Sequence, residues 1–211
     1  MCSIVTKIQK PITVKGDQSK EKLGLVHVIT GHGKGKTTSS LGLALRAIGT
    51  GYKVYMIQFL KSGSTGELYA AKHLPNFTIK QFGVDALREM QKSQSNLSEF
   101  AKKDLTGHFV FQPDIEEKEA AIKGFQHAKN IIESQEYDLV ILDEINCIID
   151  KGFVSVNEII DLINNNNKTE IYMTGRDAPK ELLEHVDYFS EIKVHKHPWQ
   201  KGINARKGIE Y

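Results

Sequence analysis

Two lysines and two threonines follow closely spaced glycines in the segment VITGHGKGKTTSS, residues 28–40. Backbone N–H groups freed by glycine, with a nearby ammonium group, form a cradle for phosphate, and a hydroxyl at the next helix start can ligate magnesium. The usual pattern is Gly, four residues, then Gly-Lys-Ser/Thr. Gly35-Lys36-Thr37 supplies the second half, but Thr30 occupies the first glycine position and the glycine lies at Gly31. The segment predicts a phosphate site with a loop one residue short. A tight turn with incidental lysines explains its flanking strand and helix less well.

Two carboxylates end an apolar run further along the chain. The segment LVILDE, residues 139–144, reads as a strand buried on both faces that ends in Asp143 and Glu144. A carboxylate at this end of a strand can reach a magnesium ion shared with Thr37. A strand followed by two acids is common, but with a glycine loop about a hundred residues upstream it indicates a nucleotide-binding α/β domain.

Two basic segments near the C-terminus could contact an anionic ligand. Arg176 lies in TGRDAP, residues 174–179, directly after an apolar run, and could bind phosphate bidentately. An exposed loop arginine is an equally good interpretation. The segment HKH, residues 195–197, has no third metal ligand at a suitable spacing, so we expect it to form a positive lip over an anion.

The elements that must position these residues alternate along the chain. Asp114 and Glu117 resemble a helix start, followed by an apolar stripe, and Asp177 is expected to cap a later helix. Such alternation predicts an α/β domain with a mostly parallel sheet and helices on both faces, over residues 23–211, after a mobile polar arm, residues 1–22. Strands are expected at 25–30, 53–59, 77–83, 139–143, 170–175 and 188–194, helices at 37–49, from 114, at 155–163 and at 177–186, and the stripe is Ile115, Ile122, Phe125, Ala128, Ile131 and Ile132.

Composition excludes several classes of protein. The 28 basic and 26 acidic residues give a net charge of +2, without the basic excess of a nucleic-acid-binding protein. Two cysteines, Cys2 and Cys147, can form neither a disulfide framework nor a four-thiolate zinc site, and Cys147 is expected to be buried. No segment is apolar enough for a signal peptide or a membrane span, which favours a cytoplasmic protein without a membrane partner.

Four segments together identify a family. TGHGKGKTT, LVILDEI, TGRDAPKELLEHVDYFSEI and HKHPWQKGINARKGIEY resemble the P-loop type ATP:corrinoid adenosyltransferases, over about residues 25–60 and 106–211. The resemblance implies a RecA-like P-loop nucleotide-binding fold and a homodimer. It implies transfer of the 5′-deoxyadenosyl group of ATP to cobalt(I) of a reduced corrinoid such as cobalamin, with release of triphosphate. A reduced flavoprotein is the implied electron donor.

The same resemblance implies roles for the motif residues. Because cobalt(I) is itself a strong nucleophile attacking carbon, neither an activated side chain nor a general base is needed. Lys34, Lys36 and Arg176 would stabilise the leaving triphosphate, and Thr37, Asp143 and Glu144 would hold Mg²⁺. The implied ATP-binding residues are Gly31, His32, Gly33, Lys34, Gly35, Lys36, Thr37 and Thr38.

One part of the family pattern is missing. The family uses aromatic side chains, typically including a Trp before the long helix, to displace the lower axial ligand of cobalt, but the single Trp here is Trp199. Phe109 and Phe111 are expected to contact the corrinoid instead, although both could equally belong to a core strand. Two other functions stay open: a thymidine-kinase-like phosphotransferase, whose usual four-cysteine zinc lasso two cysteines cannot build, and a non-catalytic ATP-binding protein.

Overall fold

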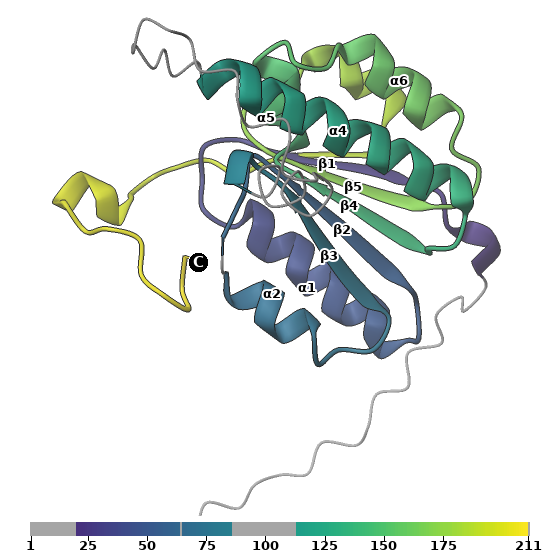
Figure 1. Ribbon diagram of the computed structural model, residues 1–211, viewed down its shortest axis with the longest axis horizontal. Coiled ribbons are helices and arrows are strands. Elements are labelled where there is room, and N and C mark those ends of the chain that lie inside the picture. Colours follow the sequence, from purple (N-terminus) through teal and green to yellow (C-terminus); the bar gives the residue numbers. More distant parts are fainter. Residues whose placement is uncertain (1–19, 64, 86–112, 211) are drawn as a thin grey trace, which may run out of the picture.

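The computed structural model describes residues 20–63, 65–85 and 113–210, and one sheet runs through this part of the chain (Figure 1). Its six strands are all parallel, in the order β3-β2-β4-β5-β1-β6. The expected α/β class with a parallel sheet is therefore confirmed. The strands are β1 (Val26–Thr30), β2 (Val54–Phe59), β3 (Phe77–Phe82), β4 (Leu139–Asp143), β5 (Glu170–Thr174) and β6 (Tyr188–Glu191).

Helices cover both faces of the sheet (Figure 1). On one face, Ala44 and Ala47 of α1 (Lys36–Gly49) pack on Val54, Met56 and neighbours from β4 and β5. The helix α2 (Gly66–Ala71) lies on the same side. The opposite face carries α4 (Pro113–Ser134), α5 (Ile145–Asp150) and α6 (Val156–Asn164). With both faces covered, the central strands can be apolar at nearly every position, and β2 and β4 are buried throughout.

The strand order decides which loops meet. β5 lies between β1, which leads into the glycine loop, and β4, which ends in Asp143. Ligands of open parallel sheets bind beyond the carboxyl ends of the strands. The loops after β1, β2, β4, β5 and β6 therefore surround one region at this edge.

Two helix predictions are wrong in part. α4 begins at Pro113, so Asp114 lies inside the helix rather than at its cap. Its expected apolar stripe holds only toward the C-terminal end, because Ile115 and Ile122 are 53% and 46% exposed while Phe125 and Ala128 are buried. α4 contacts the sheet through a face that also uses small residues, Ala120 and Ala121, which a search for large apolar residues overlooks.

The segment after Asp177 also differs from expectation. Instead of an α-helix capped by Asp177, the chain forms the 3₁₀ helix η2 (Lys180–His185), and Asp177 has a left-handed φ of 51°. Pro179 disfavours helical geometry at the residue before it, which delays the helix start. The described part of the chain also forms the 3₁₀ helices η1 (Lys20–Lys22) and η3 (Pro198–Lys201).

The expected N-terminal arm, residues 1–22, lies outside the described residues except for η1. There Lys20 Nζ donates to Asp138 Oδ1 and Oδ2, each at 2.8 Å. Among the described residues, no helix is long and apolar enough to cross a membrane.

Candidate functional site

The glycine loop connects β1 to α1 and folds around the side chain of Lys36. Lys36 is the first residue of α1, and its Nζ donates to Gly31 O at 2.6 Å and Gly33 O at 2.8 Å. Gly31 and Gly35 have φ of 100° and 128°, which side chains other than glycine rarely allow. The loop thus holds its own lysine at the N-terminus of a helix, where anions bind favourably.

The backbone of Ile192, just after β6, closes the short loop. Ile192 N donates to Thr30 O, and Gly33 N donates to Ile192 O, both at 2.8 Å. A Cβ atom on Gly31 would lie 2.5 Å from Ile192 O, and one on Gly33 would lie 2.8 Å from the same atom. Glycine is therefore required at both positions by the close approach of the segment that follows β6.

This packing explains why a threonine occupies the position of the usual first glycine. Thr30 is the last residue of β1 and is buried. Its Oγ1 accepts a hydrogen bond from Ala178 N at 3.1 Å. The residue belongs to the strand and anchors the segment that follows β5, while the loop itself starts at Gly31.

Asp143, at the end of β4, is the centre of a buried hydrogen-bond cluster. Its side chain is fully buried. Oδ1 accepts from Thr37 Oγ1 at 2.9 Å and Thr174 Oγ1 at 2.6 Å. Oδ2 accepts from Lys61 Nζ at 2.6 Å and Gln58 Nε2 at 3.2 Å. The structure thus brings together Thr37 and Asp143, which lie 106 positions apart in the sequence.

The backbone of Glu144 joins this cluster, because its N donates to Thr174 Oγ1 at 3.1 Å, but its side chain has another partner. It has a left-handed φ of 67° and precedes α5, and its Oε2 accepts from Cys147 Sγ at 2.9 Å. Burial raises the pKa of the Cys147 thiol to about 12, and the hydrogen bond to Glu144 adds to this effect. Cys147 is half-buried, less than its apolar neighbours predict.

Opposing influences act on the ammonium of Lys36. Burial lowers its pKa, the charge of Glu144 raises it, and the charge of Arg176 lowers it further. The net direction is downward, and Lys36 is almost inaccessible to solvent. Among the described residues, the hydrogen-bond partners of Lys36 Nζ are two neutral carbonyls. A buried cation in this position is suited to receive an anion, because charged partners compensate desolvation better than neutral ones.

A cleft of about 640 Å³ lies beside the glycine loop. His32, Lys34 and Arg176 line it on the loop side, so the structure gathers three of the predicted basic residues at one surface. His32 Nε2 lies 3.2 Å from Asp177 Oδ1. Thr38 is exposed on the first turn of α1. His197 of the HKH segment also lines the cleft, but His195 and Lys196 are not among its lining residues, so the positive lip stays a prediction.

The C-terminal tail forms the other wall of the cleft and reaches back to the loop. Figure 1 shows the tail leaving the sheet at the edge where the loop enters α1. Lys34 Nζ donates to Ile209 O at 3.1 Å and lies 3.6 Å from Glu210 Oε1. Arg206 donates hydrogen bonds to both carboxylate oxygens of Glu210, and these bonds lower the pKa of the Glu210 carboxyl to about 2.

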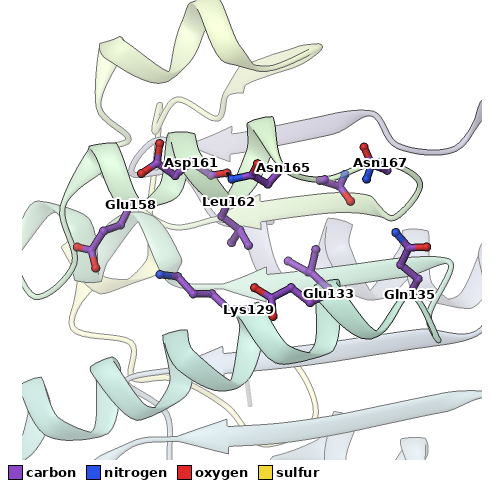
Figure 2. A pocket seen from close by; sticks show the side chains of 10 residues that line it. Lys129, Glu133, Gln135, Glu158, Asp161, Leu162, Asn165 and Asn167 are labelled. Atoms are coloured by element: carbon purple, nitrogen blue, oxygen red, sulfur yellow. Dashed lines mark hydrogen bonds between the residues drawn. The ribbon is translucent and has the colours of Figure 1, made fainter.

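A second, smaller hollow lies far from these residues. Figure 2 shows it between α4 and α6, lined by polar side chains that include Lys129, Glu133 and Glu158. None of the predicted phosphate-binding or metal-binding residues lines it. The cleft lined by His32, Lys34 and Arg176 is therefore the candidate site. Lys36, Thr37 and Asp143 are not among its lining residues.

Several residues of the site were not predicted from the sequence. They are Gln58, Lys61, Thr174 and Ile192. Lys61 could have been found, because it lies just beyond the end of β2, while Asp143 ends the neighbouring strand β4. Polar residues at the carboxyl ends of neighbouring parallel strands converge. Phe109 and Phe111, expected to contact the corrinoid, lie outside the described residues.

Comparison with known proteins identifies relatives of the whole chain. Residues 22–211 match the family model described as ATP:corrinoid adenosyltransferase BtuR/CobO/CobP. The chain is 28% identical to the corrinoid adenosyltransferases of Escherichia coli K12 and Salmonella typhimurium LT2, covering 97% of this chain and 94% of each relative. It is 29% identical to the Pseudomonas aeruginosa enzyme, over 92% of this chain and 87% of that protein.

Proposed function

Because the chain belongs to the ATP:corrinoid adenosyltransferase family, we propose that its glycine loop binds the triphosphate of ATP as the leaving group of adenosyl transfer. The family assignment agrees with a RecA-like α/β fold in which β5 separates the glycine-loop strand from the acidic strand. The observation that carries the proposal for the site is the hydrogen bond between Thr37 and Asp143 beneath the loop. It joins the two motifs that nucleotide-binding enzymes use for phosphate and its metal.

The reaction needs little from the protein in the way of proton transfer. The electron pair of cobalt(I) attacks C5′ of ATP, a Co–C bond forms, the C5′–O bond breaks, and that bond pair leaves on the triphosphate oxygen. No proton moves in this step. The tasks left to the chain are to align C5′ with cobalt and to stabilise the charge developing on triphosphate.

The basic residues of the loop and cleft perform the second task. Lys36 Nζ donates to two carbonyl groups of the loop in the described structure. Because Lys36 is the first residue of α1, its ammonium lies where phosphate oxygens would bind and can turn toward them. Lys34 and Arg176 face the cleft from one side. We assign all three to stabilisation of the leaving triphosphate, with the loop from Gly31 to Thr38 holding ATP.

The residues at the foot of the loop fit Mg²⁺. Among the described residues there is no group of three or more His, Cys, Asp or Glu side chains that would form an all-protein metal site. Mg²⁺ bound with nucleotide needs only one or two protein oxygens, because phosphates and waters complete its shell. Thr37 and Asp143 would supply these protein oxygens. Glu144, the next residue in the chain, would be the third residue of the proposed Mg²⁺ site. The bound ion would neutralise negative charge on the triphosphate.

Three further features belong to the proposal. The corrinoid substrate would contact Phe109 and Phe111, which would displace the lower axial ligand of cobalt. The active form would be a homodimer. A reduced flavoprotein would supply the electron that produces cobalt(I).

Product analysis tests the function. Protein incubated with ATP, Mg²⁺ and chemically reduced cob(I)alamin should yield a light-sensitive adenosylated corrinoid and intact triphosphate. ADP with a phosphorylated acceptor would instead indicate a thymidine-kinase-like phosphotransferase. ATP binding without turnover of any reduced corrinoid would indicate a non-catalytic ATP-binding protein.

A further inference from the structure

Lys61 occupies a position that the proposed function leaves unexplained. Its Nζ lies 2.6 Å from Asp143 Oδ2 and 3.2 Å from Thr37 Oγ1, so it contacts both oxygen-bearing residues that we assign to Mg²⁺. The ammonium group and a metal ion would therefore compete for the same two side chains. The backbone around Lys61 is also conformationally constrained.

Two features constrain the backbone at Lys61. Leu60, directly before it, has a left-handed φ of 56°, a conformation that costs free energy in a residue other than glycine. The carbonyl of Lys61 lies so close to Gly83 that a Cβ atom there would be 2.6 Å away. Strained backbone of this kind is retained where surrounding structure requires it, often at functional sites.

The hydrogen bonds of Asp143 leave no acceptor position open. An ionised carboxylate offers about four lone-pair positions on its two oxygens, and Thr37, Thr174, Gln58 and Lys61 donate to them. A metal ion can reach Asp143 directly only if one donor leaves.

Lys61 is the donor best able to leave. Gln58 and Thr174 are fully buried, and Gln58 is also held by hydrogen bonds to Glu67 and Gln81. The side chain of Lys61 is 27% exposed, and it is long and flexible. Its departure would also remove a positive charge from the place that a divalent cation enters.

From this arrangement we infer that Lys61 is a resident counter-cation of Asp143, which Mg²⁺ displaces when it enters with the nucleotide. The inference rests on the proposed ATP and Mg²⁺ site. Without nucleotide, the ammonium compensates a buried carboxylate that would otherwise be unpaired. Lys61 is therefore a positioning residue that sets how strongly ATP binding depends on the metal.

The test is the ratio of ATP dissociation constants measured in EDTA and in saturating Mg²⁺, by calorimetry without corrinoid so that ATP is not consumed. Lys61→Met removes the competing charge and nearly keeps the side-chain length. We expect the ratio to rise about tenfold, which corresponds to about 1.4 kcal/mol. Lys72→Met removes a lysine that lies over the ring of Tyr69 on the surface, and should leave the ratio unchanged.

A second readout does not depend on nucleotide. Metal-free Lys61→Met should melt at a lower temperature than wild type, because Asp143 loses its counter-charge. Lys61→Arg keeps a cation and should retain a wild-type ratio. If the methionine variant does not fold, Lys61→Gln, which keeps a donor for Asp143, should show the increased ratio.

An unchanged ratio in Lys61→Met or Lys61→Gln would overturn the inference, and a smaller ratio would show that the lysine helps to hold the metal. Either result leaves the proposed function intact as long as wild type adenosylates the corrinoid. Wild type that binds ATP equally with and without Mg²⁺ would overturn the metal site and this inference together. Wild type that does not bind ATP would overturn the proposed function itself.

Discussion

Replacing Gly31 with alanine tests whether the short loop depends on the backbone of Ile192. Gly31 has a φ of 100°, and a Cβ atom there would lie 2.5 Å from Ile192 O and 3.0 Å from Ile192 N. These are backbone atoms held by hydrogen bonds to Thr30 and Gly33. They cannot rotate away as a side chain could, so the loop itself must move.

The magnitude follows from two separate costs. A residue other than glycine held in such a strained conformation costs about 1–3 kcal/mol. Forcing a methyl group into packed atoms costs about 1–3 kcal/mol more. We expect Gly31→Ala to lose about 3 kcal/mol of unfolding free energy, since partial movement of the loop relieves both costs at once. For a chain of this size, the melting temperature should fall by roughly 6–12 °C.

Urea unfolding and ATP calorimetry measure the two consequences. Movement of the loop shifts the Gly31 and Gly33 carbonyls that hold Lys36, so ATP affinity should fall as well. Gly42→Ala is the matched control, because Gly42 lies in α1 with nothing within 4 Å of an added Cβ. That variant should gain about 0.5–1 kcal/mol from helix propensity. Wild-type stability and ATP affinity in Gly31→Ala would refute the reasoning.

Three further predictions concern single side chains around the site. Lys36→Ala should abolish measurable ATP binding by calorimetry while circular dichroism stays native, and near-normal turnover would show that the loop is not the site. Thr30→Val removes the acceptor of the Ala178 N–H and should cost about 1–3 kcal/mol in urea unfolding; an unchanged midpoint would mean that this hydrogen bond contributes nothing. Because the pKa of Cys147 is raised from 9.0 to about 12, its thiol should resist alkylation at pH 8 in the native state, as seen by peptide mass spectrometry. The folded state binds the thiol proton more tightly than the unfolded state. The contribution of this proton to the free energy of unfolding is therefore fully present below pH 9 and is lost as the pH rises toward 12. Rapid alkylation of native protein at pH 8 would contradict the raised pKa.

The sequence by itself determined the local elements and the chemistry of the loop. The apolar run of β4, the helical spacing in α1 and the Gly35-Lys36-Thr37 sequence each report on neighbours a few positions away, where periodicity and glycine geometry act. The pairing of a phosphate loop with Asp143 could be inferred because carboxyl ends of parallel strands meet at one edge.

Only the tertiary structure decided which groups complete the site. A parallel strand pairs through a long crossover, so local pattern cannot specify its neighbours. The register of β2 against β4 sets Gln58 beside Asp143 and so brings Lys61 near it. The pairing of β6 with β1 presses Ile192 against the glycines. The sequence shows that Thr30 replaces the usual first glycine and that the loop is short. The group that closes this loop, the backbone of Ile192 after β6, lies about 160 residues further along the chain, so the local sequence could not reveal it.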